Sequence, residues 1–238
     1  PFMVQQDPSY GDPYHLMPVQ ASCGARPCAG KGDGGLDGSK VAMGGEAGAS
    51  FATWLARQGS EGIISPNYSQ DVVKDAFMKG EVPYVVSGPW NTADFTKAIP
   101  DVVVDPIPAA GTQKARPFVS VQAFFVSSYS KNQLAANYYL MNYIGTKKVQ
   151  LQLYKAGQRP PALLAAERDP SVADDPIMKS LAAIGKTAIP QPNLPQMSAV
   201  YTYWGPAEVS IEFGKGDDAA GVWQRTCDKI DVDIAAAT

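Results

Sequence analysis

Apolar residues recur at helical spacing along most of the chain, which predicts a helix-rich protein. Ala47, Phe51, Trp54 and Leu55 lie at positions i, i+4, i+7 and i+8, on one face of a predicted helix over residues 45–58. The same spacing, together with start and stop signals, predicts further helices. These begin near Asp12, Ser69, Asn91, Ser130, Thr146, Ala162, Asp175, Met197 and Asp218.

Three short apolar runs predict buried strands, at 83–86 (PYVV), 101–105 (DVVVD) and 118–126 (FVSVQAFFV). Gly80 is expected in a left-handed cap at the end of the helix before the first run. Residues 29–39 are glycine-rich and predict a surface hairpin, and the prolines of 189–195 predict irregular structure. Strands alternating with helices indicate an α/β fold with parallel strands. Because these strands are few for so many helices, we expect part of the sheet to be missing from the chain.

Composition and charge narrow the classes of protein. Of the 238 residues, 45% are hydrophobic, enough for a normal core, and the net charge is −3. No surplus of basic residues is present to neutralise phosphates, so a nucleic-acid partner is disfavoured. The sequence contains no run of about 18 apolar residues, so it predicts no membrane span. The chain opens at Pro1 without an initiator Met, so we expect a processed form or a piece of a longer protein.

Reactive side chains are sparse. Cys23 and Cys28 enclose a short loop and can either pair or stay free, whereas Cys227 lies on a helical apolar stripe and is expected to be a buried thiol. His15 is the only histidine, and no Ser or Cys nucleophile motif accompanies it. We therefore predict no catalytic site, no metal site and no cofactor, and that the protein is not an enzyme.

Sequence blocks in a particular order carry a family resemblance. They are Pro13-Tyr14, AFMKGE (76–81), GPW (88–90), Pro-Ile-Pro (106–108), PFVSVQAFFVS (117–127), YIGT (143–146), QRPPAL (158–163) and NLPQMSA (193–199). In this order the blocks resemble the extracellular solute-binding proteins of ABC importers, and among them the maltose/maltodextrin-binding type. GPW and PQMSA are the most specific blocks.

The resemblance implies an α/β, periplasmic-binding-protein-like fold of two lobes, with sugar bound in the cleft between them. Residues 1–105 and 172–238 would form most of the second lobe. Residues 106–171 would supply the hinge crossings and the returning part of the first lobe. The alignment also implies that the N-terminal portion of a family member is absent, which agrees with the shortage of strands.

The resemblance also implies stacking residues. Sugar rings have apolar faces and a rim of hydroxyls, so a sugar site needs flat aromatic rings as well as hydrogen-bonding groups. Trp90 matches a stacking tryptophan after Gly-Pro, and Tyr14 matches a sugar-contacting aromatic residue. Tyr201 falls where the family often has a second stacking tryptophan. Its neighbour Trp204 is expected in the core.

Three further positions match contacting residues with changes. Asp12 takes the place of a contacting Glu and His15 that of a Phe. Tyr68 aligns with a contacting Tyr, although the helix after it is longer here. Gly205 stands where a polar contact can occur, so that contact is expected to be absent.

The function implied by the resemblance is reversible capture of maltose or a malto-oligosaccharide and its delivery to the membrane permease subunits of an ABC importer. Another oligosaccharide, such as trehalose, is an alternative ligand. A glycoside hydrolase that uses Asp12 with Asp71 or Glu208 is a third possibility. The expected location is outside the cytoplasm, in the periplasm or at the cell surface as a lipoprotein. We expect a monomer.

Overall fold

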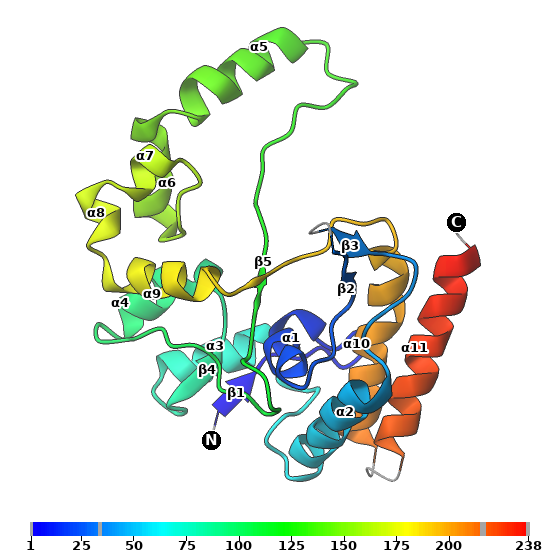
Figure 1. Ribbon diagram of the computed structural model, residues 1–238. Coiled ribbons are helices and arrows are strands. Elements are labelled where there is room, and N and C mark those ends of the chain that lie inside the picture. The colour runs from blue at the N-terminus through cyan, green and yellow to red at the C-terminus, as the bar shows by residue number, and fades with distance from the viewer. Residues whose placement is uncertain (1, 33–34, 215–217, 237–238) are drawn as a thin grey trace. The chain divides into compact units, whose positions relative to one another are not determined.

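The computed structural model describes residues 2–32, 35–214 and 218–236, so Asp33 and Gly34 of the predicted hairpin lie outside the described residues. The chain divides into two compact units (Figure 1), and each is described by itself. Unit 1 comprises Pro1–Ser87, Pro106–Val119 and Ala188–Thr238, and unit 2 comprises Gly88–Asp105 and Ser120–Thr187. The assignment of residues 1–105 with 172–238 and of residues 106–171 to two lobes stays a prediction.

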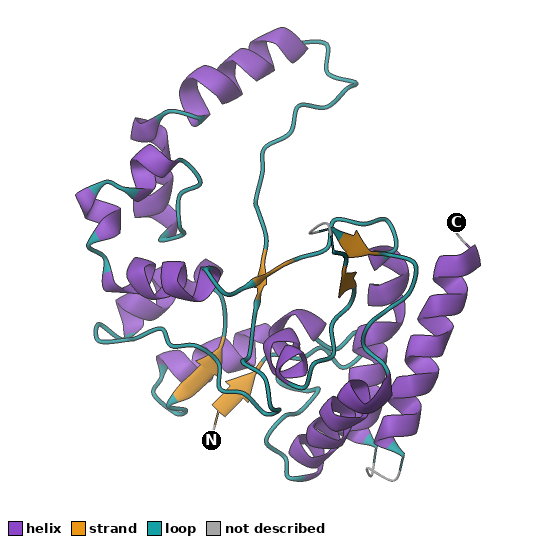
Figure 2. Ribbon diagram, viewed as in Figure 1, coloured by secondary structure: helices purple, strands orange, loops and turns teal. Residues whose placement is uncertain are grey.

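Unit 1 combines helices with short paired strands, which Figure 2 colours by type. Its helices are α1 (Pro13–Ser22), α2 (Gly45–Ser60), α3 (Gln70–Met78), α10 (Met197–Phe213) and α11 (Ala219–Ala236). Its strands are β1 (Phe2–Val4) parallel to β4 (Tyr84–Val86), β2 (Ala29–Gly30) antiparallel to β3 (Leu36–Asp37), and β5 (Phe118–Val119) parallel to β6 (Ile189–Pro190). The predicted helices and the hairpin of this unit are confirmed.

Local sequence signals account for several helix ends. The side chain of Asp12 accepts a hydrogen bond from the backbone N–H of His15 at the start of α1, and Pro13 occupies the first position of that helix. The Ser69 side chain caps α3 in the same way by accepting from Val72 N–H. Gly80 has a φ of 74°, as predicted for a left-handed residue after a helix.

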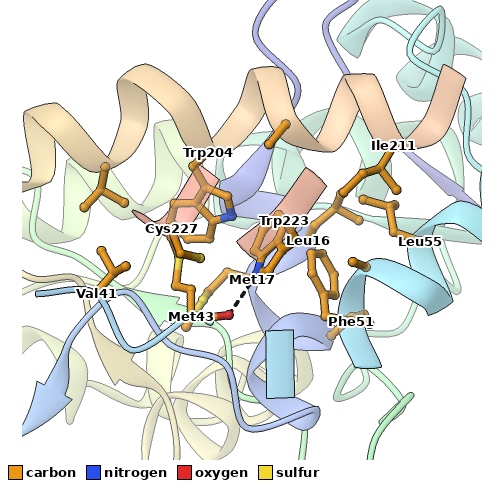
Figure 3. Packing of buried hydrophobic residues seen from close by; sticks show 14 of the residues in the cluster. Leu16, Met17, Val41, Met43, Phe51, Leu55, Trp204, Ile211, Trp223 and Cys227 are labelled. Carbon is orange, nitrogen blue, oxygen red and sulfur yellow. Dashed lines mark hydrogen bonds between the residues drawn. The ribbon is translucent and has the colours of Figure 1, made fainter. Parts of the chain in front are cut away.

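The core of unit 1 lies where α2, α10 and α11 pack against one another. Trp204 of α10 and Trp223 of α11 are fully buried there (Figure 3), and each indole N–H has an acceptor. Trp223 Nε1 donates to the Met43 carbonyl at 2.8 Å, and Trp204 Nε1 donates to Gln20 Oε1 at 2.9 Å. Trp204 is therefore a core residue, as predicted. Cys227 is a buried free thiol, also as predicted.

Two glycines let the chain before α1 touch the backbone of α10. A Cβ on Gly205 would lie 1.6 Å from the Tyr10 carbonyl oxygen, and a Cβ on Gly11 would lie 2.5 Å from the Gly205 carbonyl oxygen. Gly11 also has a φ of 60°, which favours glycine. Helix α10 continues through Gly205 and Pro206. The start of α1 is thus set directly against α10.

Unit 2 is built from short helices. They are η1 (Pro89–Asn91), α4 (Thr92–Ala98), α5 (Gln133–Tyr139), the π-helix η2 (Leu140–Ile144), α6 (Lys147–Gly157), α7 (Leu164–Glu167), α8 (Pro170–Ala173) and α9 (Pro176–Gly185). A small core forms around Tyr154, Val172, Ile177 and Met178. The Tyr154 hydroxyl donates to Asp175 Oδ2 at 2.5 Å, while the other oxygen of that carboxylate caps α9.

The strand predictions are wrong in part. Residues 101–105 form no strand, and the predicted strand over 118–126 keeps only its first two residues as β5, with Phe125 89% exposed beyond it. Strand β4 forms, but its Tyr84 is 70% exposed rather than buried. The reason is that an apolar run becomes a buried strand only beside strands that satisfy its backbone groups. Each sheet of the described residues has only two strands.

Two smaller expectations also need correction. The stretch 189–195 is not wholly irregular, because its first residues pair with the chain around β5. Ile189 N–H donates to Pro117 O and Gln191 N–H donates to Val119 O. Pro190 lies between these two donors, at a position where the pairing needs no N–H. The helix expected from Ser130 begins at Gln133 with Asn132 as its cap residue. In the part of the chain that the structure describes, no helix has both the length and the apolarity to cross a membrane.

We expect Gly205→Ala to destabilise unit 1, because the new methyl group would collide with the Tyr10 carbonyl, 1.6 Å from the ideal Cβ. Urea denaturation followed by circular dichroism should show a loss of about 1–3 kcal/mol in the free energy of unfolding. Gly30→Ala is the matched control, since nothing lies within 4 Å of its ideal Cβ. Equal stability of the two variants would contradict the close contact.

Candidate functional site

Asp12 is held at the start of α1 by two neighbouring side chains. Its Oδ2 accepts a hydrogen bond from Gln5 Nε2 at 2.6 Å and lies 2.8 Å from His15 Nδ1. Gln5 directly follows β1, at the carboxyl end of a parallel pair, where open α/β sheets bind ligands. The carboxylate of Asp12 is therefore fixed in direction, while its side chain keeps 15% of its surface exposed.

Aromatic rings surround this position. Tyr14 lies 5.8 Å from Phe118, which lies 6.3 Å edge-on from Trp204, and Trp204 lies 5.6 Å from Tyr201, all measured between ring centroids. Tyr14 and Tyr201 are half-buried, whereas Phe118 and Trp204 are buried beneath them. The two tyrosines thus belong to one packed aromatic cluster with partly accessible members. Such rings can cover the apolar face of a sugar.

The hydroxyl of Tyr201 is oriented by an amide. Gln191 Nε2 donates to it at 3.1 Å, and Gln191 follows strand β6. Burial raises the pKa of Tyr201, and the neighbouring Tyr14, Asp12 and Glu208 add to this increase, against the hydrogen bond from Gln191. The hydroxyl therefore stays neutral and can still donate a hydrogen bond to a ligand.

Glu208 and Glu212 lie one turn apart on α10 and are both buried. Burial, followed by the charges of Glu212 and Asp12, raises the pKa of Glu208 well above its usual value, against nearby N–H groups of Asp12 and Trp204. Burial raises the pKa of Glu212 to about 8. Neither carboxyl makes a hydrogen bond of normal geometry to the described residues. Both are therefore uncharged over a wide range of pH.

Tyr68 and Trp90 are the remaining aromatic residues predicted for the site. Tyr68 accepts a hydrogen bond from Gln6 N–H through its backbone carbonyl at 2.8 Å, and no described contact links its ring to Tyr14 or Tyr201. Trp90 belongs to η1 in unit 2. A Cβ on Gly88 would lie 2.2 Å from the Trp90 ring, so the glycine of GPW lets the indole fold back over the backbone. The roles of all six predicted residues stay predictions.

Three residues of the cluster were missed by sequence reasoning. Gln5 and Gln191 are polar residues that directly follow short apolar runs, which is a weak signal at best. Phe118 was assigned only to a predicted strand. Nothing in the local sequence indicates that these side chains meet Asp12, Tyr201 and Tyr14, because the contacts join segments far apart in the chain.

The described residues contain no group of three His, Cys, Asp or Glu side chains arranged to hold a metal ion. Cys23 and Cys28 are free thiols in this structure, so the disulfide that the sequence left open is not formed. A surface depression of about 380 Å³ lies in unit 2 among α7, α8 and α9. Its lining residues fall between positions 167 and 182, and none of them is a predicted site residue.

Comparison with known proteins now becomes informative. A model of the bacterial extracellular solute-binding protein family matches residues 3–180. The chain belongs to this family. The predicted resemblance is therefore confirmed, and so is the helix-rich α/β fold of the maltose-binding kind.

Relatives of this solute-binding protein are named for oligosaccharides. This protein is 23% identical over 190 residues to a galactooligosaccharide-binding protein of Bacillus subtilis. The alignment covers 78% of this chain and 45% of the relative. It is 23% identical over 150 residues to a maltodextrin-binding protein of the same organism, covering 63% of this chain and 36% of that one. The chain thus spans less than half the length of these curated relatives.

A solved structure agrees over nearly the whole chain. The maltotriose-binding protein of Thermus thermophilus, bound with maltotriose, superposes with a TM-score of 0.85 at 25% identity. The match covers 98% of this chain and 61% of that structure. The fold of the solute-binding protein is therefore that of a maltotriose-binding protein along the length compared.

Buried Glu212 predicts that the stability of this protein falls as the pH rises from about 4.5 to about 8. Glu212 keeps its proton up to about pH 8 in the folded state but has a usual pKa of 4.5, so its contribution is complete below 4.5 and is lost as pH rises through 8. Urea unfolding should show a free energy that falls over this range by on the order of a few kcal/mol. Glu212→Gln should flatten the slope, whereas the exposed control Glu61→Gln should keep it. A slope unchanged in Glu212→Gln would contradict the assignment.

Proposed function

We propose that this solute-binding protein binds a malto-oligosaccharide noncovalently, through the aromatic and amide groups around the start of α1. The observation that carries the proposal is the cluster in which half-buried Tyr14 and Tyr201 adjoin the oriented carboxylate of Asp12. Stacking on the rings would hold the apolar faces of the sugar, while Asp12 and the Tyr201 hydroxyl would meet its hydroxyls. The maltodextrin and maltotriose names of the matching proteins support the same ligand class.

In the whole protein, we propose that Trp90 adds a further stacking ring and that His15 and Tyr68 contact the ligand. Delivery to the membrane subunits of an ABC importer would follow, outside the cytoplasm, as the family description suggests. These roles rest on the family and on the residue matches GPW and Pro-Tyr. They belong to the full-length protein, of which this chain spans part of the relatives' length.

Binding without chemical conversion is the proposed outcome. The hydrolase alternative needs two carboxyls that reach a substrate, but Glu208 is 0% exposed and Asp71 lies in α3, on a separate element from Asp12. A buried acid cannot protonate a glycosidic oxygen in solvent-accessible sugar. We therefore favour a binding protein over an enzyme.

A galacto-oligosaccharide is a second candidate ligand. The B. subtilis protein of that name covers 78% of this chain, more than the maltodextrin-binding relative does. Both ligand classes present the same kinds of faces and rims, so the aromatic cluster accommodates either. The difference lies in which hydroxyls meet Asp12 and Tyr201.

Titration with maltotriose, a galacto-oligosaccharide and trehalose, followed by tryptophan fluorescence, tests the proposal. Maltotriose should change the fluorescence, because Trp204 adjoins Tyr201 at 5.6 Å. Tyr201→Ala should weaken maltotriose binding by about tenfold through lost stacking. The exposed Tyr84→Ala is the control and should bind as the unsubstituted protein does. Calorimetry that detects no heat with any of these sugars would sink the proposal.

A further inference from the structure

Glu208 is a buried side chain that sugar contact does not explain. It is 0% exposed, so it cannot touch a ligand, and its oxygens make no hydrogen bond of normal geometry within the described residues. A carboxyl that is buried without a hydrogen bond destabilises the folded state. An apolar residue of similar size would avoid that cost, so the position of the carboxyl calls for an explanation.

The surroundings of Glu208 supply one. The chain before α1 meets α10 through Gly11 and Gly205, whose missing side chains allow contact between backbones. Glu208 lies three residues after Gly205, and its carboxyl is close enough to the Asp12 backbone N–H and to the Asp12 charge to feel both. The group therefore lies beneath the first residue of the candidate site.

We infer that Glu208 is a positioning residue for the sugar site: its fully buried carboxyl, three residues along α10 from the contact of Gly205 with the chain before α1, holds Asp12 and the start of α1 against α10. A neutral carboxyl can lie beside Asp12 without repelling the Asp12 carboxylate. An ionised one would repel that carboxylate across a medium of low polarity. Ionisation of Glu208 would thus loosen the site and weaken binding, an inference that rests on the proposed function.

The ionisable groups that face Glu208 are few. Glu212 approaches it from one turn along α10 and Asp12 from the N-terminus of α1, and both raise its pKa. Tyr201 lies on the same helix and has its own pKa raised in part by Glu208. No ionisable side chain of the neighbouring helices α2 and α11 is among the causes of the Glu208 shift. The electrostatic effect therefore runs between Glu208, Glu212 and Asp12.

Affinity for maltotriose, measured by calorimetry as the pH is raised from acid into the alkaline range over which the protein stays folded, tests the inference, because burial and the charges of Glu212 and Asp12 raise the pKa of Glu208 well above its usual value. The unsubstituted protein should bind about tenfold more weakly at the alkaline end. Glu208→Ala should weaken binding at every pH. Glu208→Gln, which keeps the shape and cannot ionise, should recover most of that loss and should bind with little dependence on pH.

Glu212→Gln is the matched control, because Glu212 is also a buried acid of α10 but has burial as the only cause of its pKa shift. It should alter the pH dependence of stability and still bind more weakly in alkali, with the change beginning at a lower pH because the Glu212 charge no longer raises the pKa of Glu208. A Glu208→Gln variant with the binding profile of the unsubstituted protein would overturn the inference. So would a Glu212→Gln variant that loses its pH dependence to the same extent.

A second readout does not need sugar. His15 is the only histidine of the sequence and its Nδ1 lies 2.8 Å from Asp12 Oδ2, so its imidazole proton signals report on the position of Asp12. In the unsubstituted protein these signals should shift as the pH is raised into the alkaline range. The shift should be absent in Glu208→Gln and present in Glu212→Gln. If maltotriose does not bind, the proposed function fails, but the NMR comparison still decides. Identical alkaline changes in both variants would overturn the positioning role.

Discussion

The contact between two backbones, at Gly11 and Gly205, is the constraint on which the candidate site depends. Because neither residue carries a side chain, the Tyr10 carbonyl lies directly against the backbone of α10. A methyl group on Gly205 would stand 1.6 Å from the Tyr10 carbonyl oxygen. That contact sets the height and direction of α1 on α10. Asp12 and Tyr14 come from α1, and Tyr201 and Glu208 come from α10, so their spacing follows from one close approach.

The core around this contact holds two tryptophans whose buried N–H groups need acceptors. Both buried tryptophans donate their N–H, one to Gln20 and the other to Met43, which fixes the rings in single orientations. The aromatic cluster of the site is continuous with this core through Trp204. The half-buried ring of Tyr201 thus packs on the ring of Trp204, whose orientation its hydrogen bond to Gln20 fixes.

The short parallel strand pairs of unit 1 are covered only in part. Val4 of β1 and Phe118 of β5 are buried in the core, whereas Tyr84 of β4 is 70% exposed and Val119 of β5 is 44% exposed. Beyond β5, Phe125 is 89% exposed. The same chain spans 61% of the Thermus maltotriose-binding structure, so the relatives have additional chain where this sequence has none.

Helices, caps and family were determined by the sequence itself. Ser69 and Gly80 mark the ends of α3 because capping depends on residues only a few positions apart, and the order of blocks such as GPW identified the family. The fate of apolar runs was not determined in this way, since 118–126 needed partner strands to be buried. Tertiary structure alone decided that Gln5, Gln191 and Glu208 meet Asp12 and Tyr201. These contacts join segments that are far apart in the chain. The residues near each position in the sequence do not determine how closely such segments pack.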